Sequence, residues 1–269
     1  MSNLFELTNR RFLITGGCGL LGIQHAVAIA KFGGIPILVD VDISKKAEIT
    51  NSIHSQTGIY PEIYKLDITS EDDVIKLSNF LKEKPLHGLV NNAALNPTVG
   101  SSGTISNSGK IEEYCIDTWN KELSVSLTGT LLMLKHCAPL LIQTKGVILN
   151  ISSDLGIIAP NHSIYNDSPN TFDQVKPVGY SVTKSGIIGF TKYMATYWAH
   201  LGVRCNAICP GGVDNGQDPQ FIDRLSKLIP LGRMASIDEY HGLIIFLLSD
   251  ASSYINGSII SADGGRTAW

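Results

Sequence analysis

The stretch Arg11–Gly22, RFLITGGCGLLG, decides the fold of this 269-residue chain. An apolar run (11–15) leads directly into glycines at positions 16, 17, 19 and 22, and an apolar-periodic segment begins at Leu20. Glycines in such a loop allow a tight turn and a close approach of the backbone to a ligand, and the free N–H groups of a following helix attract phosphate. The stretch therefore predicts a strand, a phosphate-binding loop and a helix, in the order of a dinucleotide-binding fold.

Short apolar runs alternate with longer helical patterns along the rest of the chain. Continuously apolar strands separated by helices argue for a parallel sheet covered on both faces. We expect one α/β domain over residues 1–269, Rossmann-like and doubly wound, with about seven parallel strands and helices on both faces. The runs expected to form the strands are RFLIT (11–15), IPILVD (35–40), EIYKLD (62–67), HGLVNN (87–92), GVILNIS (146–152), VRCNAIC (203–209) and SIISAD (258–263).

Three irregular segments are candidate substrate loops. Asn96–Gly109 and Pro160–Pro177 each follow the predicted end of a strand, and a third lies near residues 212–230. Ligands bind parallel sheets beyond the carboxyl ends of the strands, and long loops in a compact domain usually carry function. We therefore expect these loops to shape the substrate site.

An acidic residue closes the second predicted strand. Asp40 lies 24 residues after Gly16, close to the spacing at which a carboxylate accepts hydrogen bonds from the adenosine ribose. A carboxylate there would repel a 2′-phosphate, and the glycine loop carries Cys18 but no arginine or lysine. The sequence thus favours NAD over NADP. Lys45 and Lys46 begin the next helix, where they either reach a phosphate or form a solvated helix start.

The stretch Pro177–Lys192 carries Tyr180 and Lys184 one helical turn apart, on the same face of a predicted helix. An ammonium close to a tyrosine hydroxyl favours the phenolate and lowers a pKa that starts near ~10, which lets the tyrosine exchange protons at neutral pH. Ser152 and Ser153 end an apolar run upstream. Together these side chains predict alcohol–carbonyl chemistry.

Composition argues against several function classes. A formal charge of −3 and a pI near 6.1 provide no basic stripe for nucleic acid or for a membrane surface. The N-terminal residues lack a signal-peptide pattern, and no apolar run approaches the ~18 residues of a membrane span, so we expect a cytoplasmic protein. The histidines form no H-x-x-x-H pattern, so no metal site is expected. Reduced core or near-core thiols are expected at Cys18, Cys115, Cys137, Cys205 and Cys209.

Taken in order, the motifs of this chain resemble those of the short-chain dehydrogenase/reductase family over essentially its whole length. They are the glycine loop, Asp67, the run Asn91-Asn92-Ala93-Ala94, Ser153 with Tyr180 and Lys184, Pro210-Gly211 and Asp263-Gly264-Gly265. The resemblance implies that Tyr180 donates or accepts the proton, Lys184 holds the nicotinamide ribose and lowers the pKa of the tyrosine, and Ser153 orients the substrate oxygen.

The resemblance also implies the cofactor contacts. Asp67 would contact adenine, the run after Asn91 would line the adenine and ribose side, and Pro210-Gly211 with Val213 would lie beside the nicotinamide. The complete expected set is Gly16, Cys18, Gly19, Leu20, Leu21, Gly22, Asp40, Asp67, Ile68, Asn92, Ala93, Ala94, Tyr180, Lys184, Pro210, Gly211 and Val213.

The chain departs from the family pattern in three places. Its TGGxGxxG loop resembles the larger sugar-nucleotide branch, and Ser126 stands where the compact branch has an asparagine that helps hold a proton-relay water. We include Ser126 among the catalytic candidates because a hydroxyl can also bind water.

The third departure is the spacing of 27 residues from Ser153 to Tyr180, which residues 160–177 lengthen. This segment resembles a subgroup associated with bacterial surface-sugar and flagellin-glycan biosynthesis. Candidate contacts to a polar substrate are His162, Tyr165, Asn166 and Asn215; the alternative is that they are surface-loop residues without a partner.

The sequence predicts an NAD-dependent oxidoreductase that interconverts a secondary alcohol and a ketone on a small polar substrate, a sugar or sugar phosphate. Two alternatives stay open: a sugar-nucleotide epimerase or dehydratase that cycles bound NAD, and a non-catalytic dinucleotide-binding regulator.

The predicted helix over 178–200 carries an apolar stripe that forms either core or subunit interface: Ile187, Phe190, Met194 and Tyr197. The resemblance implies a homodimer or homotetramer, with Arg266 and Trp269 in that interface or in a frayed end.

Overall fold

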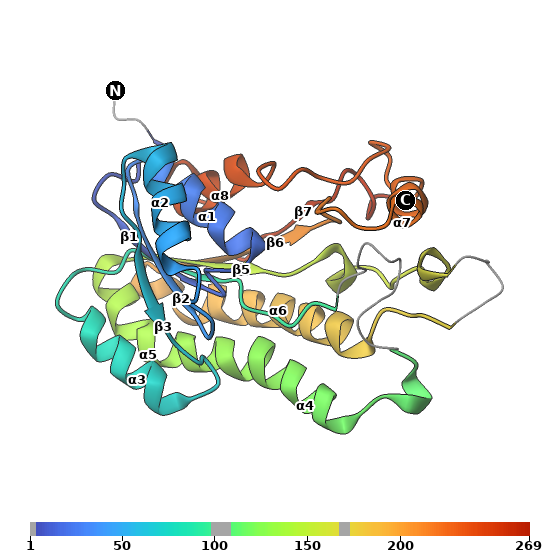
Figure 1. Ribbon diagram of the computed structural model, residues 1–269. Helices are drawn as coiled ribbons and strands as arrows, with labels where there is room; N and C mark the ends of the chain where they lie inside the picture. Colours follow the sequence, from blue (N-terminus) through green and yellow to red (C-terminus); the bar gives the residue numbers. More distant parts are fainter. Residues whose placement is uncertain (1–3, 98–108, 167–172) are drawn as a thin grey trace.

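A computed structural model describes residues 4–97, 109–166 and 173–269 of the chain. Parts of two predicted loops, residues 98–108 and 167–172, lie outside the described residues. In the described part, seven parallel strands form one sheet in the order β3-β2-β1-β4-β5-β6-β7 (Figure 1). They are β1 (Arg11–Thr15), β2 (Ile35–Asp40), β3 (Glu62–Lys65), β4 (Gly88–Asn91), β5 (Val147–Ile151), β6 (Arg204–Pro210) and β7 (Ile259–Ala262).

This topology confirms the predicted single-domain, doubly wound α/β fold. The chain builds β1, β2 and β3 outward in one direction and then returns to place β4 on the other side of β1. Ligands bind at such a switch point in open parallel sheets. Every predicted strand is present, and the observed strand ends differ from the predicted ones by two residues at most.

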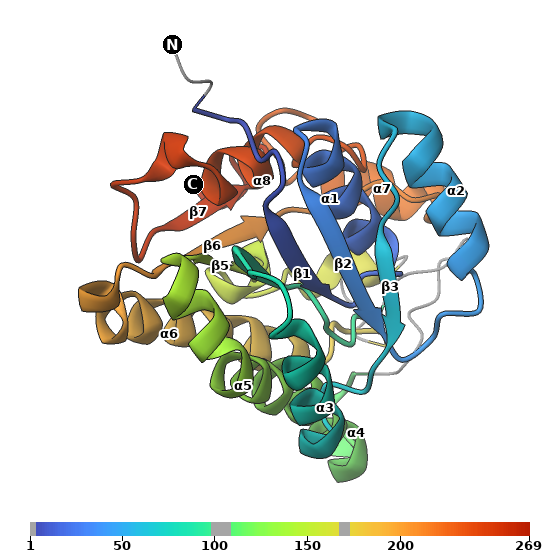
Figure 2. The same cartoon turned by 90° about the vertical axis from the view of Figure 1, so that its left-hand side faces the viewer.

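Helices cover both faces of the sheet (Figure 2). α1, α2 and α8 pack on one face, and α3, α5 and α6 pack on the other. The helices are α1 (Leu20–Lys31), α2 (Lys46–Thr57), α3 (Glu71–Leu81), α4 (Ile116–Leu123), α5 (Gly129–Thr144), α6 (Val178–Tyr197), α7 (Pro219–Ser226) and α8 (His241–Leu248).

The strands divide their side chains between two apolar clusters because successive residues point to opposite faces. In β1, Phe12 and Ile14 pack with α1 and α8, whereas Leu13 packs with α3 and α5. All three side chains are fully buried. Burying a side chain of this size stabilises the fold by about 1.5–3 kcal/mol, which explains why uninterrupted apolar runs form the strands.

Local signals account for the helix ends. Ser70 caps α3 by accepting a hydrogen bond from the Asp73 N–H at 3.3 Å, as expected for a polar residue before an acidic first turn. α6 ends at Tyr197 and is followed by a 3-10 turn (Ala199–Leu201) and by Gly202 at φ +83°, a conformation that favours glycine.

Most of the apolar stripe on α6 packs in the hydrophobic core. Ile187 and Met194 are buried, and Phe190 packs against the apolar cluster that contains Met194 and the buried side chains of α3 and α5. Tyr197 is exposed. The stripe is therefore core up to Met194, and its last member faces away from the core.

One helix passes the length and hydropathy criteria for a membrane span. A π-helical turn (Ser124–Thr128) joins α4 to α5, so that helix runs continuously over Ile116–Thr144. By length and hydropathy alone this helix could cross a membrane, but half of its most apolar window is buried inside the fold. Met133, Leu134 and Cys137 lie in the core cluster, so the apolar character of the segment has a structural explanation.

All five cysteines are free thiols. Cys137, Cys205 and Cys209 are buried and Cys18 is half-buried, as expected, but Cys115 is exposed at the start of α4. The expectation of a core or near-core position is wrong for Cys115, because it precedes the helix and lies outside its buried face.

A buried chain of hydrogen bonds links the centre of the sheet to α6. The Asn91 Nδ2 group donates to Asn150 Oδ1 at 2.8 Å, and Asn150 Nδ2 donates to Thr191 Oγ1 at 2.9 Å. Asn91 and Asn150 lie opposite each other in the register of β4 and β5, and Thr191 lies on α6. This polar chain fixes how α6 sits against the two strands.

Replacing Asn150 with alanine should lower the free energy of unfolding by about 2–4 kcal/mol, because the Asn91 amide would be left buried without a partner. Urea denaturation followed by tryptophan fluorescence measures the loss. Asn51→Ala, on the exposed side of α2, is the control and should change stability by less than ~0.5 kcal/mol. Equal effects of the two substitutions would contradict a structural role for the hydrogen-bond chain.

Candidate active site

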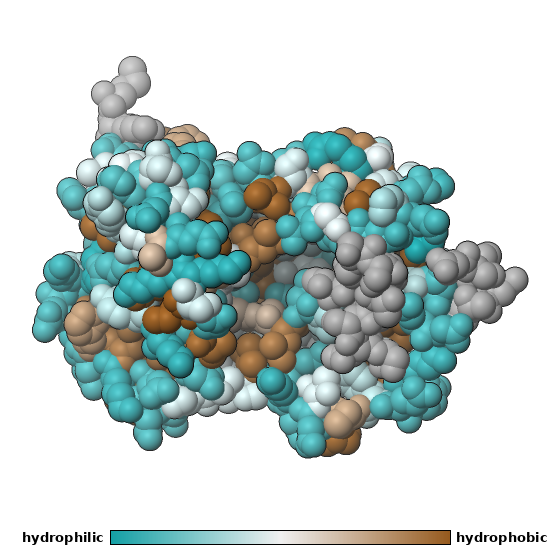
Figure 3. Space-filling model, viewed as in Figure 1, coloured by the Kyte–Doolittle hydropathy of each residue, from teal (hydrophilic) through white to brown (hydrophobic). Residues whose placement is uncertain are grey.

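The carboxyl ends of the central strands open onto a cavity of about 1010 Å³. Figure 3 shows this face of the molecule hollowed at its centre, with apolar residues on the walls of the hollow. Predicted site residues from eight separate parts of the chain meet there: Gly16, Gly19, Leu20, Leu21, Asp40, Asp67, Ile68, Asn92, Ala93, Ala94, Ser153, Tyr165, Tyr180, Lys184, Pro210, Gly211, Val213 and Asn215.

The glycine loop forms one end of the cavity and requires its glycines. Gly16 has a φ of +59°, and a Cβ atom on it would lie 2.9 Å from Ala93 Cα. A Cβ on Gly22 would lie 2.2 Å from the Gly16 carbonyl oxygen, so Gly22 lets α1 pack tightly on the loop and does not itself line the cavity. No side chain caps the start of α1, which leaves its first N–H groups for a ligand.

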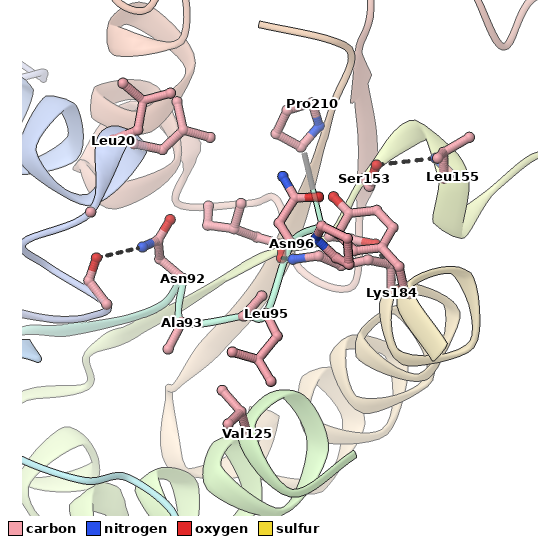
Figure 4. A pocket seen from close by; sticks show the side chains of 18 of the residues that line it. Leu20, Asn92, Ala93, Leu95, Asn96, Val125, Ser153, Leu155, Lys184 and Pro210 are labelled. Atoms are coloured by element: carbon pink, nitrogen blue, oxygen red, sulfur yellow. Dashed lines mark hydrogen bonds between the residues drawn. The ribbon is translucent and has the colours of Figure 1, made fainter. Parts of the chain in front are cut away.

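Asn92 braces the same loop from the end of β4. Its Nδ2 group donates to the carbonyl oxygens of Thr15 and Gly16, both at 3.0 Å. Figure 4 shows the Asn92 side chain directed at the loop. The Thr15 hydroxyl oxygen in turn accepts from the backbone N–H groups of Asn92 and Ala93. The two polar side chains thus hold the loop in a fixed shape beside the cavity.

Asp40 lies half-buried at the end of β2, next to the glycine loop. Its carboxylate accepts from the backbone N–H of Cys18 at 3.0 Å and of Asp42 at 3.2 Å. Cys18 therefore meets the site through its backbone, and its side chain does not line the cavity. The Lys46 ammonium donates to the Ile63 carbonyl at 2.9 Å, so this lysine is tied to the neighbouring strand and is not simply solvated.

Ser153 and Lys184 lie at the opposite end of the cavity (Figure 4). Tyr180 lines the cavity with them. The Ser153 hydroxyl donates to Asp154 Oδ1 at 2.8 Å and accepts from the Leu155 N–H at 3.2 Å. The Lys184 ammonium donates to the Ile151 carbonyl at 2.8 Å and lies 5.7 Å from the centre of the Tyr180 ring. The start of α6 thus brings the tyrosine and the lysine to the end of β5.

Burial controls the pKa values of this group. It raises the pKa of Tyr180 to about 12, and hydrogen bonding by Ser153 acts in the opposite direction. Burial also lowers the pKa of Lys184 to about 8. The expected lowering of the tyrosine pKa by Lys184 is not seen in this structure, because the ammonium is directed at the Ile151 carbonyl and burial dominates the pKa of the phenol.

Two further cations line the cavity, and neither was predicted to belong to the site. Lys176, which is 8% exposed, donates to Asn96 Oδ1 at 2.8 Å and to the Pro97 carbonyl at 2.7 Å. Its ammonium lies 4.1 Å from the centre of the Tyr180 ring. Arg266 donates through Nη1 to Asp154 Oδ2 at 2.6 Å, and both side chains of this ion pair are buried. Arg266 is thus part of the cavity wall and neither frays nor forms an outer surface.

Three candidates lie apart from the main cavity. Ser126 is buried in the π-helical turn, and its neighbours Ser124 and Val125 line the cavity in its place. His162 lines a second cavity of about 510 Å³, and burial lowers its pKa. The Asn166 amide is bound to the backbone of His162 and Gln174, so it holds the loop together. These positions result from long-range packing that the sequence alone does not reveal.

Comparisons with known proteins identify the family. A family model described as enoyl-(acyl carrier protein) reductase matches residues 21–267. The oxidoreductase YxbG of Bacillus subtilis is 30% identical over 98% of this chain and 93% of its own length. The chain belongs to the short-chain dehydrogenase/reductase family. This short-chain dehydrogenase is also 29% identical to 2-(S)-hydroxypropyl-CoM dehydrogenase 3 of Xanthobacter autotrophicus over the full length of both.

A solved structure agrees with this assignment. The gluconate 5-dehydrogenase of Burkholderia cenocepacia, in complex with NADP and tartrate, matches the short-chain dehydrogenase with a TM-score of 0.84 at 26% identity, covering 99% of this chain and 98% of that one. Members of the family are oxidoreductases of alcohol and ketone substrates and bind a nicotinamide dinucleotide. The glycine loop fits such a cofactor, because Gly16 lets the loop lie close against Ala93 beside the cavity and the start of α1 is uncapped. Within the described ranges, no three His, Cys, Asp or Glu side chains could hold a metal ion.

Proposed function

We propose that this short-chain dehydrogenase is a cytoplasmic, NAD-dependent enzyme that interconverts a secondary alcohol and a ketone on a sugar or sugar phosphate. The observation that carries the proposal is one cavity that joins the glycine loop and Asp40 at one end to Ser153, Tyr180 and Lys184 at the other. This arrangement supports a dinucleotide lying along the strand ends with its reactive end beside the phenol.

The residues divide the chemistry between them. A bound nicotinamide cofactor supplies or accepts the hydride. Ser153 would orient the substrate oxygen, and Tyr180 would take the proton from an alcohol or return it to a ketone. Lys184 uses one N–H for the Ile151 carbonyl and keeps two donors for the ribose and for the phenolate. Glycine-loop N–H groups and the start of α1 would hold the pyrophosphate.

The carboxylate of Asp40 supports NAD over NADP, because it lies where a 2′-phosphate would meet a like charge. The solved gluconate 5-dehydrogenase contains NADP, so relatives of this fold differ in this choice.

A polar substrate is supported by the cavity wall, where Asn96, Asn215 and Gln217 supply polar groups near the catalytic side chains. Two of the relatives are named for the oxidation of hydroxylated compounds. We further propose a role in bacterial surface-sugar biosynthesis, which rests on the resemblance carried by residues 160–177.

We also propose that the chain forms a homodimer or homotetramer through α6 and its neighbours. Large apolar side chains are exposed on these helices, including Tyr193 at 62%, Tyr197 at 55% and, on α5, Leu131 at 49%. Unpaired apolar surface of this kind is typical of interfaces between copies.

Sedimentation velocity of the wild-type protein should show particles of at least twice the 29.1-kDa chain mass, because assembly would bury these side chains. A double variant, Tyr193→Glu with Tyr197→Glu, should shift the particles toward the monomer. A wild-type monomer at all micromolar concentrations would contradict the proposed assembly.

Replacing Tyr180 with phenylalanine should lower kcat for alcohol oxidation by about 10²- to 10⁴-fold, since the general acid–base group is lost. NADH binding, measured by fluorescence titration, should stay within about 3-fold of wild type because the ring remains.

In the wild type, oxidation should accelerate from pH 7 toward pH 10, because only the phenolate accepts the proton and burial raises the Tyr180 pKa.

Tyr254→Phe, a change at a fully exposed tyrosine, serves as the control and should leave turnover unchanged. Full activity of the Tyr180 variant would overturn the mechanism. Product formation without net change in reduced nicotinamide would point to internal recycling of the cofactor.

Replacing Asp40 with serine should reduce the ratio of kcat/KM for NAD to that for NADP by about 10-fold or more, because the carboxylate that binds the ribose and repels the 2′-phosphate is removed. Initial rates with each cofactor under the same conditions measure this ratio. Asp42→Ser, an exposed aspartate two residues further on, is the matched control. A ratio that stays constant in the Asp40 variant would show that cofactor choice lies elsewhere.

A further inference from the structure

We infer that Lys176, together with Asn96 and Arg266, forms a subsite for an anionic group of the substrate, a carboxylate or a phosphate. The inference rests on the proposed function and deepens it by naming the substrate class: a hydroxylated compound with an anionic group a few bonds from the carbon that is oxidised.

Lys176 carries a buried charge without a carboxylate partner. Two of its three N–H groups donate to neutral oxygens, the Asn96 amide and the Pro97 carbonyl. In the described part of the chain, no carboxylate lies within ion-pair distance of its ammonium, whereas Arg266, another cation of the site, is paired with Asp154. A buried cation held only by neutral groups is unfavourable, and burial accordingly lowers the pKa of Lys176 to about 7. A bound anion would offset this cost.

Asn96 is oriented by the lysine. Because its Oδ1 atom accepts the hydrogen bond from Lys176, its Nδ2 group is left as a donor. Figure 4 shows the Asn96 side chain projecting toward the part of the cavity that Ser153 and Lys184 line. The ammonium and the amide therefore present N–H donors to an oxyanion, and the two oxygens that accept from Lys176 are already engaged.

The charge balance around the phenol is positive. Three cations, Lys176, Lys184 and Arg266, line this end of the cavity, and Asp154 is the one carboxylate among the lining residues there. Asp154 already accepts from Arg266 and from the Ser153 hydroxyl. The remaining guanidinium N–H groups of Arg266 extend the donor surface, and the excess of positive charge favours an anionic substrate over a neutral one.

The subsite lies close to the reacting groups. The Lys176 ammonium is 4.1 Å from the centre of the Tyr180 ring. An anion bound there is therefore separated from a hydroxyl at Tyr180 by only a short stretch of substrate. A compact polyhydroxy acid or a small sugar phosphate meets this requirement.

Three sets of probes test the inference: polyhydroxy acids, sugar phosphates and neutral polyols of matched chain length, each assayed with NAD. The wild type should favour anionic over neutral compounds by about 100-fold in kcat/KM. Lys176→Met should lower kcat/KM for anionic substrates by about 100-fold, mainly through KM, and change that for neutral polyols by less than about 3-fold. Lys176→Arg should retain most of the preference, and Lys82→Met, at an exposed lysine on the end of α3, should behave as wild type.

The preference of the wild type for acids or for phosphates shows whether the subsite binds a carboxylate or a phosphate group. If Lys176→Met lowers kcat/KM for neutral and anionic substrates equally, the proposal of an anionic subsite is wrong, although the dehydrogenase proposal stands. NADH binding and the melting temperature of each variant show whether it is folded.

A binding measurement separates failure of the subsite from failure of the proposed activity. Calorimetric titration of the NADH-loaded protein with tartrate and with inorganic phosphate needs no turnover. The wild type and Lys176→Arg should bind at least one of the two anions, and Lys176→Met should bind it at least about 10-fold more weakly. Equal binding by wild type and Lys176→Met, or no binding of either anion by the wild type, would overturn the subsite.

Discussion

The hydrogen-bond chain from Asn91 through Asn150 to Thr191 determines how the candidate catalytic side chains are placed. It joins β4, β5 and α6 inside an otherwise apolar core, where each polar group must find a partner. Apolar packing alone tolerates sliding of a helix along a sheet, whereas these side chains meet in one register only. Tyr180 and Lys184 lie on α6, two to three turns before Thr191, and Ser153 lies two residues after the end of β5. The distance between the phenol and the serine is thus set by a contact deep in the core.

Electrostatics around the phenol reflects a balance between burial and charge. Burial raises the pKa of Tyr180 and lowers the pKa values of Lys176 and Lys184, so each group is moved toward its neutral form. A ligand that brings negative charge would reverse the effect on the lysines and keep them protonated. With such a ligand the two lysines would have different roles: Lys184 would act at the ribose and the phenol, and Lys176 would act at the substrate.

The fold was predictable because its signals are local. Apolar runs mark the strands, and the glycines of 16–22 mark the turn into α1, so neighbouring residues suffice to find them. The glycine loop, Asp40 and the Tyr180–Lys184 pair could also be located, because their signals are likewise local. Lys176 and Arg266 could not, because their partners are remote: Lys176 bonds Asn96 across 80 positions, and Arg266 bonds Asp154 across 112. A lone lysine or arginine in a polar loop gives no sign of such a partner.

The Asp-Gly-Gly run near the end of the chain has a physical purpose in this structure. Gly264 and Gly265 have φ values of +66° and +91°, and the Asp263 carboxylate accepts from the N–H groups of Gly265 and Thr267. A Cβ on Gly211, at the end of β6, would lie 2.8 Å from Asp263 Cα, so the turn packs directly on the cavity wall. This tight turn directs Arg266 inward to Asp154, the neighbour of Ser153. Arg266 and the turn before it therefore complete the candidate site, and they would act on the chemistry through Asp154 and the serine hydroxyl.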